Sequence, residues 1–215
     1  ENLLDARIDQ LLRLIFLMQP QKTAKPYSPE EHHAIARDAA RRSAVLVKNE
    51  GCVLPLRANT RVAVIGDFAK TPRYQGAGSS LIQPTKLECA LVALKETGLQ
   101  IVGYEPGFRR FGGKSGRKRN RACALAKRAD VALVFLGLDE GSEAEGVDRE
   151  HMRLRDNQLH LLREIRRACT RVVVILANGA PVEAHWAEDA DAILLGYLGG
   201  QAGGGPNAPA QRFSA

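Results

Sequence analysis

Residues 131–149, VALVFLGLDEGSEAEGVDR, join an uninterrupted apolar run to the loop of the chain that is richest in carboxylates. The run 131–136 is typical of a strand that is covered on both faces of a parallel sheet. Five carboxylates follow within ten residues: Asp139, Glu140, Glu143, Glu145 and Asp148. Glycines within this loop allow tight turns, so the loop can present a carboxyl group to a ligand.

On both sides of this stretch, predicted strands and helices alternate along the chain. Apolar, β-branched runs predict strands at 62–65, 101–104, 131–136, 172–177 and 192–195. Helical spacing predicts helices at 29–47, 85–97, 120–129 and 156–168. Such alternation implies right-handed crossovers between parallel strands. The sequence therefore predicts an α/β fold with a mainly parallel, five-stranded sheet flanked by helices on both faces, an α/β sandwich of the flavodoxin-like kind.

Two of these helices begin with a capping signal. Ser28 precedes Pro29 and is followed three residues later by Glu31, which is the pattern of a capping box. Thr85 and Glu88 repeat the pattern. We expect the first of these helices to lie close against the sheet through a narrow stripe: Ala36, Ala40, Ala44 and Val47.

The formal charge of +7 is concentrated in one segment. Residues 109–128 hold nine Lys or Arg and no acid, and no aromatic residue follows Phe111 there to stack on a base. We interpret this segment as a solvated loop and helix face and expect no nucleic-acid partner. No apolar run approaches the ~18–20 residues of a membrane span, and the four cysteines lack the spacing of a disulfide framework. We therefore expect reduced thiols, no membrane contact and a cytoplasmic location.

The loops that follow the strands are the expected place for a site. In parallel α/β sheets, ligands bind beyond the carboxyl ends of the strands. The loops after 62–65, 131–136, 172–177 and 192–195 share that edge and are glycine-rich and polar. The first of them contains RYQGAGSS, 73–80, whose backbone N–H groups and hydroxyls can bind a ligand. A phosphate cradle is one alternative there, although neither a Gly-Lys-Ser/Thr ending nor a GxGxxG motif is present.

The string SEAEGVDR, 142–149, resembles the acid/base loop of glycoside hydrolase family 3, which includes many β-glucosidases. Three further segments resemble that family in the same order: AARRSAVLVKNEGCVLPL at 39–56, VAVIGDFAKTPRYQGAGSSLIQPT at 62–85 and ILLGYLGGQAGGG at 193–205. The resemblance implies that residues 30–205 are the C-terminal α/β sandwich domain of a retaining β-glycosidase. Such an enzyme hydrolyses O-glycosidic bonds, with glucosides as the expected substrates and with no cofactor or metal.

The same resemblance implies roles for particular residues. Glu145 would be the general acid/base, and Glu143 is the competing choice. The residues expected to contact substrate are Arg73, Gly76, Gly78, Ser79, Ser80, Glu143, Asp148 and Arg149. In an extended segment, Glu143 and Glu145 point to opposite sides, so one would face the rim and the other solvent. We expect Glu143 and Asp148 to raise the pKa of Glu145, and Arg149 to pair with Asp148.

The nucleophile of that family is an Asp of a preceding (β/α)₈ barrel, and no matching segment is present here. Residues 1–29 resemble the last helix of such a barrel and a linker, so a barrel domain and a small glycoside or oligosaccharide are the expected partners. Residues 206–215 are expected to form a disordered tail. A sheet that is incomplete at this end would promote association between copies of the chain. We expect the chain alone to be inactive; the alternative is a nucleotide-binding, phosphate-binding or interaction module.

The histidines and the single tryptophan give weaker signals. His32 and His33 begin a helix and are expected to face solvent, and metal binding there would need carboxylates or cysteines nearby. Trp186 can stack on a sugar ring, but packing in the core or at an interface is the favoured interpretation.

Overall fold

The computed structural model describes residues 2–19, 26–79 and 81–203. The chain divides into two compact units, one ending at residue 31 and the other beginning at residue 32. Helix α1 (Asn2–Leu17) makes up most of the first unit and has no buried residue. The second unit carries the sheet. Ser80 and the expected tail at 206–215 lie outside the described residues.

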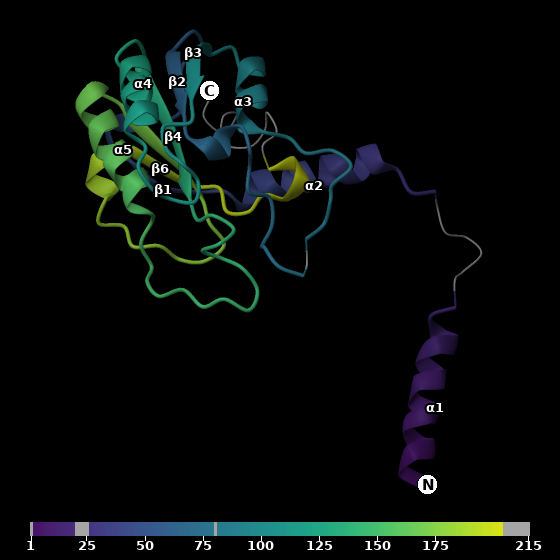
Figure 1. The fold of residues 1–215 in the computed structure, drawn as a ribbon. Coiled ribbons are helices and arrows are strands. Elements are labelled where there is room, and N and C mark those ends of the chain that lie inside the picture. Colours follow the sequence, from purple (N-terminus) through teal and green to yellow (C-terminus); the bar gives the residue numbers. More distant parts are fainter. Residues whose placement is uncertain (1, 20–25, 80, 204–215) are drawn as a thin grey trace. The chain divides into compact units, whose positions relative to one another are not determined.

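Six strands form the sheet, one more than the sequence predicts (Figure 1). They are β1 (Val45–Asn49), β2 (Arg61–Ile65), β3 (Gln100–Glu105), β4 (Val131–Gly137), β5 (Val172–Ala177) and β6 (Ala192–Leu195). Their order across the sheet is β1-β6-β5-β4-β2-β3, and every pair is parallel except β1 with β6. The prediction of a mainly parallel α/β sandwich is therefore confirmed.

Strand β1 corrects the prediction that the preceding helix runs to Val47. Helix α2 (Pro29–Ser43) ends earlier, and Val45 and Val47 belong to the strand. Val45 pairs with Leu195 of β6. β-branched residues favour a strand over a helix, and the edge of β6 offers them backbone partners, so sheet pairing decides the conformation here.

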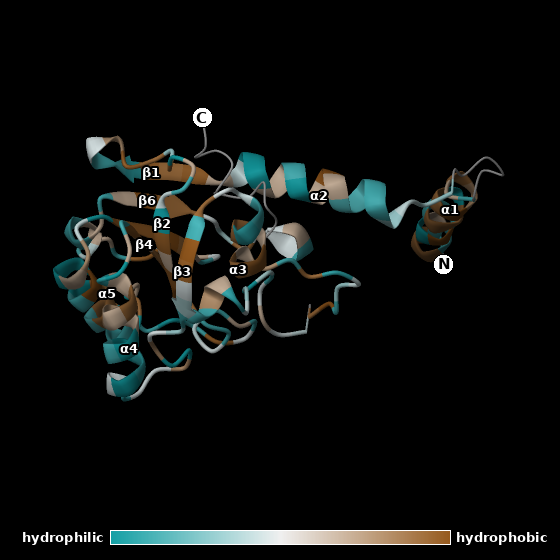
Figure 2. Cartoon of the chain, turned by 90° about the horizontal axis from the view of Figure 1, so that it is seen from above, coloured by the Kyte–Doolittle hydropathy of each residue, from teal (hydrophilic) through white to brown (hydrophobic). Residues whose placement is uncertain are grey.

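The order in which strands are added reverses at β2. From β2 the chain moves to β3 at the sheet edge, then returns past β2 to β4, β5 and β6. Right-handed crossovers therefore place α3 (Ala90–Ala93) on one face, and α4 (Gly116–Ala126) and α5 (Asp156–Ala168) on the other, as Figures 1 and 2 show. The carboxyl ends of β2 and β4 flank this reversal, where doubly wound sheets bind their ligands.

Short 3₁₀ turns lie between the strands and helices of the second unit, and one follows β6. They lie at Glu50–Cys52, Asp67–Ala69, Leu94–Glu96, Ala187–Asp189 and Gly200–Ala202.

The bond made by Ser28 in the first predicted capping box is present, and the second capping box is absent. The backbone N–H of Glu31 donates to Ser28 Oγ at 3.3 Å, at the start of α2. Helix α3 begins beyond Glu88, whose carboxylate instead accepts from Arg37 and lies 2.8 Å from His33 Nε2. His33 is buried, so the expectation that it faces solvent is wrong.

The core lies between the sheet and its helices. Every residue of β4 is buried, and the strands form an apolar layer in Figure 2. Helix α5 packs on this layer through fully buried side chains, among them Leu161, Leu162 and Ile165, each worth about 1.5–3 kcal/mol on burial. Trp186 is buried and its Nε1 donates to the Glu183 carbonyl at 2.7 Å, which confirms the packing interpretation.

Candidate functional site

The loops that follow β2 and β4 are joined through their backbones. Ala77 and Ala144 form an isolated parallel bridge. The Glu145 N–H donates to the Ala77 carbonyl at 3.0 Å, and the Ala77 N–H donates to the Glu143 carbonyl at 3.4 Å. The glycine- and serine-rich loop therefore lies beside the acidic loop, at the strand reversal where a ligand is expected.

Glu143 connects three of the four rim loops. Its carboxylate forms an ion pair with Arg73 of the β2 loop and accepts from the Gly179 N–H at 3.0 Å and from the Ala180 N–H, both in the β5 loop. Its side chain is only 10% exposed. Through these donors the Glu143 carboxylate positions the three loops relative to one another.

Arg73 is buried and braces the same junction. Its Nη1 donates to the Leu138 carbonyl at 2.9 Å as well as to Glu143, and its Nη2 donates to the Glu143 carbonyl at 3.1 Å. These contacts give Arg73 a structural role at the base of the site. A contact between Arg73 and substrate stays a prediction.

Glu145 is the exposed carboxylate of the pair. Its Oε2 accepts from the Ser79 backbone N–H at 3.2 Å and from the Ser79 hydroxyl. Gly78 makes this approach feasible: it has a φ of +115°, and a Cβ at this position would lie 2.7 Å from the Cβ of Glu145. Glu143 points into the loop junction and Glu145 points out, as alternation along an extended segment predicts.

The contact with Ser79 also sets the ionisation of Glu145. The Ser79 hydroxyl, and after it the Ser79 N–H, hold the pKa of the Glu145 carboxyl below its usual value. This direction is opposite to the expected one. Glu143 does not act as a repelling neighbour because its charge is paired with Arg73.

Arg149 differs from its prediction. Its Nη1 donates to the Pro181 carbonyl at 2.8 Å, and it forms no ion pair with Asp148 within the described residues. Arg149 therefore ties the end of the acidic loop to the β5 loop, while Asp148 is exposed. Of the remaining predicted contacts, Gly76 faces open space and Ser80 lies outside the described residues.

Asp139 anchors the acidic loop at the end of β4, a role that the sequence did not predict. Its carboxylate is fully buried, pairs with Arg155, and accepts from the Gly141 N–H at 3.0 Å and from Ser142 Oγ at 3.1 Å. Burial raises the pKa of Asp139, but the Arg155 guanidinium outweighs it and holds that pKa below its usual value. Only tertiary contacts identify this carboxylate as structural.

Neither a metal-binding cluster nor a membrane-spanning helix is found among the described residues. No group of three or more His, Cys, Asp or Glu side chains there is arranged to hold a metal ion. No helix among residues 2–19, 26–79 and 81–203 has the length and apolar character needed to cross a bilayer.

The contacts of Ser79 argue against a phosphate cradle at residues 73–80. The N–H and hydroxyl of Ser79 already bind a carboxylate, so this loop presents an acid and does not support an anion site. The fold and the site together define a doubly wound α/β domain that displays an exposed carboxylate at its strand reversal.

Comparison with known proteins identifies the family. The chain belongs to the glycosyl hydrolase family 3 C-terminal domain family, whose model matches residues 44–209.

Individual relatives agree with this assignment. The chain is 41% identical over 209 residues to thermostable beta-glucosidase B of Acetivibrio thermocellus, a match that covers 95% of this chain and 28% of that protein. It is 40% identical over 189 residues to an exo-alpha-(1->6)-L-arabinopyranosidase of Bifidobacterium breve, covering 83% of this chain and 25% of that protein. The crystal structure of the Bifidobacterium adolescentis GH3 beta-glucosidase matches with a TM-score of 0.82 at 39% identity, over 92% of this chain and 29% of that chain. The chain thus spans less than a third of each of these relatives.

Proposed function

We propose that this chain is the acid/base-bearing domain of a retaining β-glycosidase, with Glu145 as the general acid/base. The observation that carries the proposal is the contrast between the two candidate carboxylates. Glu143 is enclosed by Arg73 and two backbone N–H groups, whereas Glu145 is exposed at the rim. A general acid/base must reach the oxygen of the leaving group, and only an accessible carboxyl can do so.

Glu145 would act twice in each turnover. In the first step its protonated carboxyl gives a proton to the departing oxygen, and in the second the ionised carboxylate takes a proton from the attacking water. The contact with Ser79 stabilises the ionised form, which suits the second step. Cover by a barrel domain and a bound substrate would desolvate Glu145 and raise its pKa for the first step.

The nucleophile would come from an N-terminal barrel. Retaining hydrolysis needs a second carboxyl group about 5–5.5 Å from the acid/base. We assign that group to an Asp of the barrel, since Glu143 is already engaged by Arg73. The exposed apolar residues of α1, including Leu4, Leu11 and Ile15, support a partner domain at this end of the chain. The chain alone is then expected to leave an aryl β-glucoside uncleaved.

The substrate class is a glycoside, with β-glucosides as the first to be assayed. Two relatives of similar identity are named a beta-glucosidase and an arabinopyranosidase, so this domain alone does not fix the sugar. Selection among sugars would belong to the barrel, which would form the floor of the pocket.

The test is Glu145→Gln in a chimera where this chain replaces the matching segment of thermostable beta-glucosidase B. The variant should lose about 100-fold or more of kcat/KM on an alkyl β-glucoside, whose poor leaving group needs protonation. An activated aryl β-glucoside should be affected less, because its phenolate departs without a proton.

Glu150→Gln is the matched control, since it makes the same change at an exposed carboxylate five residues away and should change neither rate. If Glu145→Gln and Glu150→Gln have the same small effect on both substrates, the role of Glu145 is refuted.

A further inference from the structure

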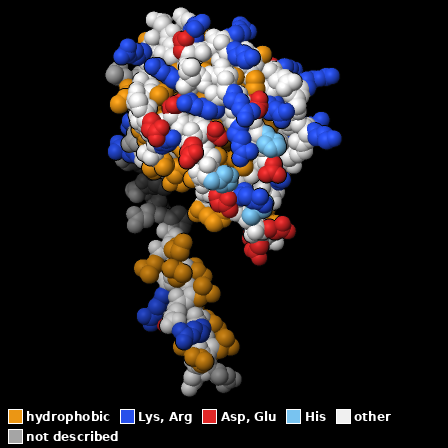
Figure 3. Space-filling model, turned by 90° about the vertical axis from the view of Figure 1, so that its left-hand side faces the viewer, with side chains coloured by type: hydrophobic (Ala, Val, Ile, Leu, Met, Phe, Trp, Pro, Cys, Tyr) orange, Lys and Arg blue, Asp and Glu red, His pale blue; other side chains and the backbone are white. Residues whose placement is uncertain are grey.

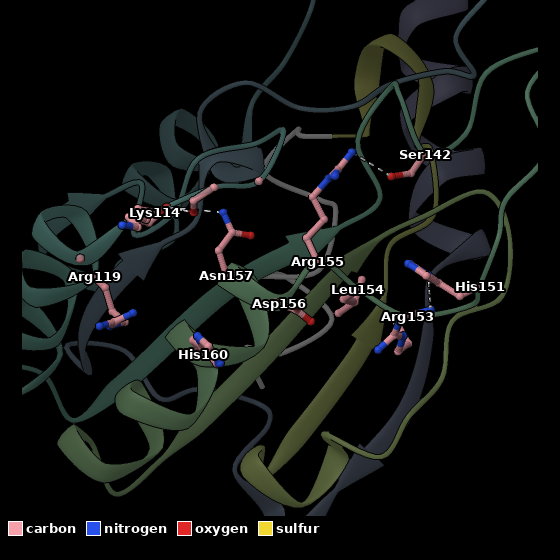
Figure 4. A pocket seen from close by; sticks show the side chains of 14 residues that line it. Lys114, Arg119, Ser142, His151, Arg153, Leu154, Arg155, Asp156, Asn157 and His160 are labelled. Atoms are coloured by element: carbon pink, nitrogen blue, oxygen red, sulfur yellow. Dashed lines mark hydrogen bonds between the residues drawn. The ribbon is translucent and has the colours of Figure 1, made fainter.

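A cavity lies beside the acidic loop that follows β4. This cavity of about 730 Å³ is bounded by the start of α4, the start of α5 and the segment 151–155 (Figure 4). Sites for small organic ligands span about 300–1,000 Å³. Neither Glu145 nor Ser79 lines this cavity, so the acid/base chemistry proposed above does not use it.

The charged residues that line the cavity are mostly cationic. Three basic side chains that have no carboxylate partner among the described residues line it: Lys114, Arg119 and Arg153. A fourth, Arg155, is paired with Asp139, and Asp156 is the one acid among the lining residues. Figure 3 shows Lys and Arg side chains gathered over the face that carries α4 and α5. Unpaired positive charge around a cavity favours an anionic ligand.

One wall is a glycine-rich loop between a strand and a helix. The segment 112–116, Gly-Gly-Lys-Ser-Gly, follows β3 and leads into α4. Loops that bind phosphate groups often have this order: a strand, a glycine-rich loop, a Lys-Ser pair and a helix. The interval from Gly107 to Lys114 is one residue longer than in the nucleoside triphosphatase motif, so this loop is not that motif.

The first N–H groups of α4 have no side-chain cap. Its N-cap residue, Ser115, makes no side-chain bond to the helix, because its Oγ accepts from the Arg109 N–H at 3.1 Å. No acid occupies the first turn. The first N–H groups of this 11-residue helix, and the positive end of its dipole, are left for an anion.

We propose that this cavity binds a phosphorylated small molecule. Its phosphate group contacts Lys114, Arg119 and the first turn of α4. A phosphorylated sugar and a nucleotide both carry such a group.

The proposal is tested by isothermal titration calorimetry of the 215-residue chain with glucose 6-phosphate, with ATP and with unphosphorylated glucose. At least one phosphorylated compound should bind, and glucose should not. Lys114→Ala should weaken that binding about tenfold, the effect of losing one charge-assisted hydrogen bond. Lys127→Ala is the matched control, since Lys127 lies just beyond the other end of α4, is exposed and does not line the cavity.

Each outcome decides the proposal. Binding of glucose 6-phosphate alone identifies a phosphorylated sugar, and binding of ATP alone identifies a nucleotide; either result supports the phosphate site if Lys114→Ala weakens it. Absence of binding by both compounds at millimolar concentration overturns the proposal. Equal weakening by Lys114→Ala and Lys127→Ala also overturns it, because the attraction is then due to net charge alone. Thermal unfolding without ligand checks that both variants fold. Ligand-induced amide NMR shifts that are confined to residues other than 112–116 would contradict the proposed location of the phosphate site.

Discussion

At the scale of single residues, the decisive contact joins Glu145 to Ser79. The hydroxyl of Ser79 is the main cause of the low pKa of Glu145, and the Ser79 N–H adds to it. A carboxyl whose pKa is lower in the folded chain than in the unfolded chain stabilises the fold above its unfolded pKa. That contribution to the free energy of unfolding is lost as the pH falls through the folded pKa. Protonation of Glu145 therefore weakens this junction.

Ser79→Ala should raise the pKa of Glu145 toward the usual glutamate value without reaching it, because the backbone N–H donor remains. A pH titration of the Glu145 carboxyl carbon by NMR measures this change. Ser142→Ala, which removes a hydroxyl bound to Asp139 instead, should leave that titration unchanged. An identical midpoint for Ser79→Ala and the unmodified chain would refute the role of the hydroxyl.

Gly78→Ala should destabilise the chain by about 1–3 kcal/mol, the usual cost of a strained backbone conformation in a residue with a Cβ. The new methyl group would also press on the Cβ of Glu145 at 2.7 Å. Urea unfolding measures the loss. Gly76→Ala is the control, because nothing lies within 4 Å of a Cβ there and the change should be near neutral. Equal stability of the two variants would contradict the packing described here.

At the scale of elements, β4 and its loop depend on the ion pair between the buried Asp139 and the partly exposed Arg155. The pKa of Asp139 is held low in the folded chain, so the pair contributes above the unfolded pKa of about 3.9 and its contribution is lost as the pH falls through the folded value. Asp139→Asn should lower the free energy of unfolding by about 1–3 kcal/mol near neutral pH. The difference from the unmodified chain should shrink below about pH 4.

Urea unfolding at several pH values measures this dependence. Asp148→Asn, at an exposed carboxylate of the same loop, should track the unmodified chain throughout. A constant deficit for Asp139→Asn across the whole pH range would mean that the charge of Asp139 is not what stabilises the loop.

Elements differ in how far the sequence predicts them. The five parallel strands β2 to β6 and helix α5 follow from local patterns, because apolar runs and helical spacing are local properties. Strand β1 does not, since its partner β6 lies about 150 residues away and a short apolar segment is ambiguous. Arg73 shows the same limit: its burial comes from Glu143 and Leu138, which only the folded loops bring near it.

At the scale of the whole molecule, β1 completes the sheet by covering the edge of β6. A chain that starts at residue 50 would leave that edge unpaired, and exposed strand edges promote association. We expect such a truncation to elute as larger species in size-exclusion chromatography than a chain that starts at residue 32, which keeps β1. Identical elution of the two truncations would show that β1 does not protect the sheet.

The bridge between Ala77 and Ala144 uses backbone atoms alone. The side chains of Ala77 and Ala144 can therefore change over evolution without breaking this bridge. Insertion or deletion of a single residue between β2 and Ala77 is different, because it would slide one loop along the other and turn Ser79 away from the carboxylate. Positions 77 and 144 should tolerate changes of residue type, whereas the loop that contains Ala77 should resist changes of length.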